Sequence, residues 1–160
     1  MFDKILISRC FLGENVRYDS KAIPLKHPLL ALWQQQKRLV AICPEVSGGL
    51  PVPREPAEQQ PHSGKVITLS NIDVSAQFND GANQALALCK KHNIRFALLK
   101  ESSPSCGSSY IYDGSFSNKK IVGQGITSQL LHQHGITVFS EHSLDKLATL
   151  LDCADLTNHQ

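Results

Sequence analysis

Five cysteines give this 160-residue chain most of its capacity for chemistry. They are Cys10, Cys43, Cys89, Cys106 and Cys153. The odd count argues against a disulfide framework, and the apolar stretch near the N-terminus is too short for a secretory signal. The sequence therefore predicts reduced thiols in a cytoplasmic protein. Reduced thiolates bind metals or act as nucleophiles, and their placement among strands and helices helps to separate these chemistries.

Short apolar runs alternate with helical patterns along the chain. Four runs predict buried strands at residues 4–8, 39–42, 94–99 and 136–140. Apolar residues at helical spacing predict helices at residues 28–38, 74–92, 125–134 and 144–151. Because parallel strands need crossover connections, this alternation predicts an α/β fold, a single-domain three-layer sandwich with a mainly parallel, Rossmann-like sheet of about four or five strands. We expect residues 1–160 to form this one domain.

Three further segments complete the predicted architecture. Residues 44–64 are rich in proline and too long for an ordinary connection, which is typical of a functional or disordered loop. Residues 65–74 read as extended chain. Residues 110–116 contain the turn pair Asp113-Gly114 and predict a small hairpin.

Three of the cysteines follow predicted strands. Cys10 comes just after the first strand, Cys43 directly after the second, and Cys106 lies in the loop that leaves the third. Parallel strands place their carboxyl ends at one edge of the sheet, which is where open α/β folds bind ligands. We therefore expect these three thiols to converge at that edge.

The residues alone leave the role of the thiols open. Each of the three could be a small buried residue beside a turn, as we expect for Cys89 on its helical apolar stripe, and Cys153 is expected to be incidental. Structural zinc sites commonly use four ligands with closely spaced cysteine pairs, which this sequence lacks. Three thiolates would instead leave one coordination position open for a substrate, so the pattern favours a metal site without naming the metal.

Acid–base and hydroxyl groups lie beside two of these thiols. Glu45 stands two positions after Cys43, and Ser103 and Ser105 precede Cys106. A loop glutamate can simply be solvated, and serines often serve turns. Beside candidate metal ligands, however, a carboxylate can move protons and a hydroxyl can orient a substrate.

Charge and hydropathy exclude other classes of function. The formal net charge is +2, and the basic residues are scattered rather than gathered into a stripe, so dedicated nucleic-acid binding is not expected. No apolar run approaches the roughly 18–20 residues of a membrane span. The histidines form no metal-ligand pair, and no phosphate-binding glycine loop occurs.

Several motifs together resemble one bacterial family, long described as a domain of unknown function, that includes the thiouracil desulfidases. The matching segments, in order, are Cys10-Phe11-Leu12-Gly13, Arg17-Tyr18-Asp19, Cys43-Pro44-Glu45-Val46-Ser47-Gly48-Gly49-Leu50-Pro51, Pro53-Arg54-Glu55-Pro56-Ala57-Glu58, Lys100-Glu101-Ser102-Ser103-Pro104-Ser105-Cys106-Gly107 and Tyr112-Asp113-Gly114. The resemblance covers about residues 4–141.

The resemblance implies a cofactor, a substrate class and a set of site residues. It implies a [4Fe-4S] cluster held by Cys10, Cys43 and Cys106, with one open iron for the sulfur of a small thiolated nucleobase. Glu45 and Ser103 match the family's catalytic positions. The implied reaction is a non-redox desulfuration of a thiouracil-like pyrimidine that yields the oxo-pyrimidine and sulfide. A resident cluster also implies cluster-assembly machinery as a partner.

Two departures and two rival hypotheses accompany this interpretation. Arg9 stands where a small residue is expected and Ser20 where glycine is usual. Neither departure touches a ligand position, but Arg9 could alter the pocket and hence the substrate. One rival is a non-catalytic metal or iron–sulfur module that senses redox state or binds a partner. Another is a metal-free site in which Cys106 acts as a nucleophile or sulfur acceptor.

Overall fold

The centre of the molecule is an all-parallel sheet, seen in a computed structural model that describes residues 2–158. Its strands run in the order β2-β1-β5-β8, with bounds β1 (Ile5–Ser8), β2 (Leu39–Ile42), β5 (Phe96–Leu98) and β8 (Thr137–Phe139). Ile5 of β1 pairs in register with Leu39 and with Phe96. All of β1 is buried, as expected for a central strand covered on both faces. The predicted fold class is confirmed.

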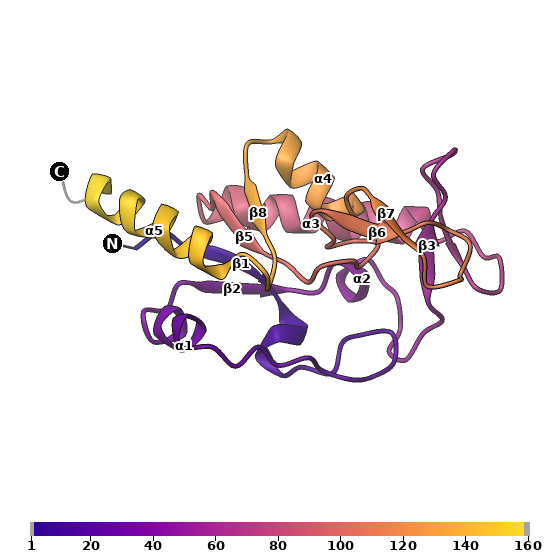
Figure 1. Ribbon diagram of the computed structural model, residues 1–160, viewed down its shortest axis with the longest axis horizontal. Coiled ribbons are helices and arrows are strands. Elements are labelled where there is room, and N and C mark those ends of the chain that lie inside the picture. Colours follow the sequence, from indigo (N-terminus) through magenta and orange to yellow (C-terminus); the bar gives the residue numbers. More distant parts are fainter. Residues whose placement is uncertain (1, 159–160) are drawn as a thin grey trace.

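Helices cover both faces of the sheet in three layers (Figure 1). One face packs against α1 (Pro28–Gln35) and α5 (Leu144–Asn158), and the other against α3 (Ser75–Lys91) and α4 (Ile126–Gln133). Alternate residues of β1 point to opposite faces of the sheet. Ile5 and Ile7 belong to the first core, which faces α1 and α5, and Leu6 belongs to the second core, which faces α3 and α4. Cys89 is fully buried in the second core, as predicted. No helix among the described residues is both long and apolar enough to cross a membrane.

Short elements gather beyond the carboxyl ends of the strands (Figure 1). They are the 3₁₀ helix η1 (Arg9–Leu12), the one-turn helix α2 (Pro44–Ser47), and two antiparallel hairpins, β3 (Ala57–Gln59) with β4 (Val66–Thr68) and β6 (Tyr110–Tyr112) with β7 (Lys120–Val122). The Gln59 side chain donates to the carbonyls of Pro104 and Gln124, and the Glu58 carboxylate accepts from the Gly114 amide. These bonds tie the two hairpins to the loop after β5.

Two segments differ from the sequence prediction for reasons of tertiary contact. The proline-rich segment 44–64 contains α2 and β3, and β3 forms because β4 supplies its hydrogen-bonding partner. Helix α5 was expected to end at Leu151 but continues to Asn158. Arg38, 3% exposed, forms a bidentate ion pair with Asp155 near the end of α5 and so holds its polar last turns against the body.

Candidate functional site

The three strand-end cysteines line one cavity of about 320 Å³ at the carboxyl edge of the sheet. Cys10 lies in η1 directly after β1, Cys43 directly precedes α2, and Cys106 lies in the loop after β5. Cys10 and Cys106 are buried, and Cys43 is partly buried. Glu45 and Ser103 line the same cavity, so the structure brings all five predicted site residues together. The volume is within the range of small-molecule sites.

Burial keeps these thiols protonated when no cation is bound. It raises the pKa of Cys10 to about 11 and that of Cys106 to about 12, and a negative charge on Cys43 adds to both shifts. The pKa of Cys43 is itself raised by burial. A nucleophilic thiol needs the opposite shift, so the environment of Cys106 does not favour a metal-free nucleophile. The positive charge of a bound metal would lower these pKa values and favour the thiolate form of each cysteine.

The site does not have the arrangement of a single-ion centre. Across residues 2–158, no three His, Cys, Asp or Glu side chains lie close enough together to hold one metal ion.

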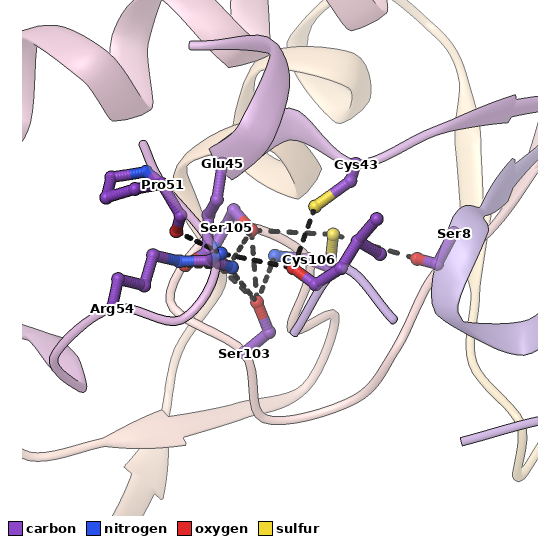
Figure 2. Close-up of polar contacts among 9 residues, drawn as sticks. Ser8, Cys43, Glu45, Pro51, Arg54, Ser103, Ser105 and Cys106 are labelled. Atoms are coloured by element: carbon purple, nitrogen blue, oxygen red, sulfur yellow. Dashed lines mark hydrogen bonds and ion pairs between the residues drawn. The ribbon is translucent and has the colours of Figure 1, made fainter. Parts of the chain in front are cut away.

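The carboxylate of Glu45 is held by a cation on one side and hydroxyls on the other (Figure 2). Its Oε1 lies 3.3 Å from the guanidinium of Arg54, whose side chain is 7% exposed. Its Oε2 accepts from Ser105 Oγ at 3.1 Å and lies 3.5 Å from Ser103 Oγ. Arg54 also donates to the carbonyls of Val16 and Pro51, so it fixes Glu45 relative to two loops. The arrangement orients an acid–base group toward the serine loop.

Two glycines allow α2 to sit directly on α3 and so place Glu45. A Cβ on Gly81 would lie 1.9 Å from the Pro44 carbonyl oxygen, and one on Gly48 would lie 1.9 Å from the Gln77 carbonyl oxygen. Only residues without a side chain permit this backbone approach. Pro44 begins α2 at its first turn, where a missing amide proton costs nothing.

The serine loop carries its own hydrogen-bond chain. Ser103 Oγ accepts from the amides of Ser105 and Cys106 at 3.2 and 3.1 Å. Because both contacts use the lone pairs of Ser103, its proton is available for donation, and Ser105 Oγ lies 3.0 Å away. Ser105 in turn reaches Glu45. A row of hydroxyls thus connects the cavity to the glutamate.

Comparisons with known proteins identify the family of this chain. The family model described as 2-thiouracil desulfurase matches residues 5–143. The chain belongs to the 2-thiouracil desulfurase family. It is 42% identical over 152 residues to the uncharacterized protein YbbK of Bacillus subtilis (strain 168). This alignment covers 89% of this chain and 99% of YbbK. The chain is also similar to the solved structure of the [4Fe-4S]-dependent thiouracil desulfidase TudS, with 49% sequence identity and a TM-score of 0.91. The match covers 94% of this chain and 99% of the TudS chain.

Sequence reasoning missed three residues that shape this desulfurase-family site. Arg54 lies in the family-like segment Pro53–Glu58, but nothing in the sequence indicates that it forms an ion pair with Glu45. Ser8 ends β1 and contacts the Cys106 sulfur from a position 98 residues away. Glu101 precedes the serine loop and proves to be buried, at 8% exposed. A buried acid beside a loop rich in small residues could have been read as an anchor for its amides.

Glu101 is the hydrogen-bond centre of the loop that carries Cys106. Its Oε1 accepts from the backbone amides of Ser102, Ser108, Ser109 and Tyr110, and its Oε2 from the Ser108 hydroxyl. Burial alone would raise the pKa of Glu101, but these hydrogen bonds outweigh it and the pKa is lowered. The ionised carboxylate therefore stabilises the loop.

We expect Glu101→Gln to lower the stability of the protein by about 1–3 kcal/mol at neutral pH, because neutral acceptors form weaker hydrogen bonds than carboxylates. The folded-state pKa is depressed, so the carboxylate contributes fully above about pH 4.5 and loses its effect as the pH falls through the folded-state pKa. Thermal unfolding of both proteins should show a difference in Tm that shrinks with acidification. The exposed Glu14→Gln is the control and should change Tm little. A Tm difference that is absent, or independent of pH, would contradict this assignment.

Proposed function

We propose that this protein is a [4Fe-4S]-dependent desulfidase that converts the thiocarbonyl of a thiolated, thiouracil-like pyrimidine into a carbonyl. Water supplies the oxygen and two protons leave with the sulfur as hydrogen sulfide, so the reaction needs no net electron. The observation that carries this proposal is the convergence of three thiols, Glu45 and Ser103 on one cavity, in a fold that aligns with TudS at a TM-score of 0.91.

The residues of the cavity fit a cluster bound through three cysteines. The donors Cys10, Cys43 and Cys106 are thiols, the ligands that iron–sulfur clusters use. Each thiolate of such a cluster binds a different iron, so the three ligands need not meet around one ion. Burial raises the pKa of all three thiols, and the positive charge of bound iron would offset this shift and favour the thiolates that ligate it.

When bound, the cluster would supply an iron without a protein ligand, a Lewis acid for the sulfur of the substrate. Glu45 would take the two protons of the attacking water, one at a time, and deliver each to the leaving sulfur. Ser103, whose proton has Ser105 or Glu45 as its partner in the unliganded site, would instead donate it to the bound pyrimidine. Arg54 would hold the Glu45 carboxylate in its orientation throughout.

Sulfide release by the cluster-loaded protein tests the proposal. Protein reconstituted anaerobically should contain about four irons per chain. It should release sulfide from thiouracils and produce equal amounts of the oxo-pyrimidine by chromatography. A loaded protein that releases no sulfide from thiolated bases, nucleosides or nucleotides would contradict the desulfidase assignment. A protein that takes up no iron under these conditions would contradict the cluster itself.

The cellular setting follows from the cofactor. A cluster with an open iron needs delivery by cluster-assembly machinery and protection from oxidants. All five cysteines are free thiols, which suits a reducing cytoplasm.

A further inference from the structure

The three cysteine sulfurs differ in their hydrogen bonds. Cys106 Sγ lies 3.7 Å from Ser8 Oγ and 3.5 Å from Ser105 Oγ, and both hydroxyls are almost fully buried. Cys43 Sγ, in contrast, faces a carbonyl acceptor, that of Val16 at 3.8 Å. Cys106 is therefore the thiol to which side-chain hydroxyls can donate (Figure 2).

Ser8 has its proton directed at this sulfur by the backbone. Ser8 Oγ accepts the amide proton of Lys100 at 3.0 Å, which occupies one of its lone pairs. Its exposed fraction is 3%, so water competes little for the hydroxyl proton. The acceptor that this proton meets is Cys106 Sγ. The end of β1 thus presents a pre-oriented O–H group to the loop after β5.

Ser105 cannot serve the sulfur in the same way. It has one proton and two acceptors, the Glu45 carboxylate at 3.1 Å and Cys106 Sγ at 3.5 Å. The carboxylate is the nearer acceptor and carries charge, so it is the stronger partner. Ser8 is consequently the constant donor to the sulfur, whereas Ser105 divides its proton between sulfur and glutamate.

We propose that Ser8 is a dedicated hydrogen-bond donor to the Cys106 sulfur as a cluster ligand, and that it raises the reduction potential of the cluster. The inference rests on the proposed function, because it requires Cys106 to bind the cluster. Hydrogen bonds to ligand sulfurs withdraw electron density and favour the more negative, reduced state. An electron-poor cluster is harder to oxidise and its open iron is a stronger Lewis acid, which suits a desulfidase without net electron transfer.

Potentiometric titration of the loaded protein, monitored by EPR, measures this effect. In Ser8→Ala the midpoint potential for one-electron reduction should become more negative. At a fixed solution potential, the ratio of oxidised to reduced cluster should rise several-fold, up to about tenfold, which corresponds to ~59 mV for a one-electron couple. Ser8→Thr, which keeps a hydroxyl, should restore most of the wild-type potential. An unchanged potential in a fully loaded Ser8→Ala protein would overturn the inference.

A matched control separates the sulfur contact from a general disturbance of the loop. Ser128 is also fully buried and its hydroxyl also contacts Cys106, but through the carbonyl oxygen at 2.7 Å. Ser128→Ala should leave the potential near that of the wild type, and a shift equal to that of Ser8→Ala would contradict a specific role for the sulfur contact. Wild-type protein that takes up no cluster would instead refute the proposed function.

A second measurement does not depend on how well the variant loads. In reduced wild-type protein exchanged into D₂O, electron–nuclear double resonance should detect an exchangeable deuteron coupled to the cluster. Its absence would overturn the hydrogen bond to Cys106. Its presence in the wild type and in Ser8→Thr, with a clearly weaker exchangeable-deuteron signal in any Ser8→Ala protein that retains a cluster, would support it, because only the shared proton of Ser105 then remains at the sulfur.

Discussion

Replacing Cys10, Cys43 or Cys106 singly by serine should remove the cluster and, with it, desulfidase activity. Each thiol lines the cavity and would hold one iron of the proposed cluster, so a lost ligand leaves a second iron without a protein partner. We expect iron to fall from about four per chain to well below one, and sulfide release to fall with the loss of the cluster. Iron and acid-labile sulfide analysis with absorption spectroscopy, after identical anaerobic reconstitution, provides the measurement.

The two remaining cysteines are matched controls for this prediction. Cys89→Ala removes a buried thiol on α3 and should lower stability by about 1 kcal/mol, while iron content stays at the wild-type level. Cys153→Ser changes an exposed thiol on α5 and should leave both unchanged. Loss of iron in either control would mean that the cluster is not held by the three cavity cysteines alone. Full retention of iron in a cavity variant would exclude that cysteine as a ligand.

The convergence of Cys10, Cys43 and Cys106 was predictable because the strands that position them are read directly from apolar runs. Ile5–Ser8 is buried at every position, and Leu39–Ile42 pairs beside it in parallel. Once these strands are recognised, the rule that parallel strands end at one edge places Cys10 and Cys43 together without further information. Cys106 follows in the same way from β5, although its loop has no regular structure of its own.

The partners of these residues were not predictable, because they depend on contacts between distant segments. Glu45 meets Arg54 only because the intervening chain folds back over the cavity, and the Ser8 hydroxyl meets a sulfur from another strand end. Periodicity reports which face of an element is buried, but it does not report which polar groups meet across a cavity. The last turns of α5 were missed for the same reason, since the ion pair of Arg38 with Asp155 stabilises a polar segment.

Glu45→Gln should abolish most of the desulfidase activity while the cluster remains. The amide has nearly the same shape as the carboxylate, and it can still accept a hydrogen bond from Ser105, but it cannot take a proton from water. Loss of a general acid–base group typically costs about 10²–10⁴-fold in rate. Iron content and the visible spectrum should match those of the wild type, because Glu45 lies beside the ligands without being one. Steady-state sulfide release should show the loss in kcat.

Glu58→Gln separates proton transfer from the loss of a buried charge at the same cavity. Glu58 is a buried acid that also lines the cavity, but its carboxylate bonds to the amides of Gly114 and Phe116. We expect the rate of the Glu58→Gln variant to stay within about tenfold of the wild type, because the Glu58 carboxylate holds a hairpin loop and moves no proton. Equal losses in the two variants would show that Glu45 acts through structure alone. An active, cluster-loaded wild type whose rate is unaffected by Glu45→Gln would require another base. A loaded wild type without desulfidase activity would instead favour a non-catalytic cluster module, in which the three cysteines are needed and Glu45 is not.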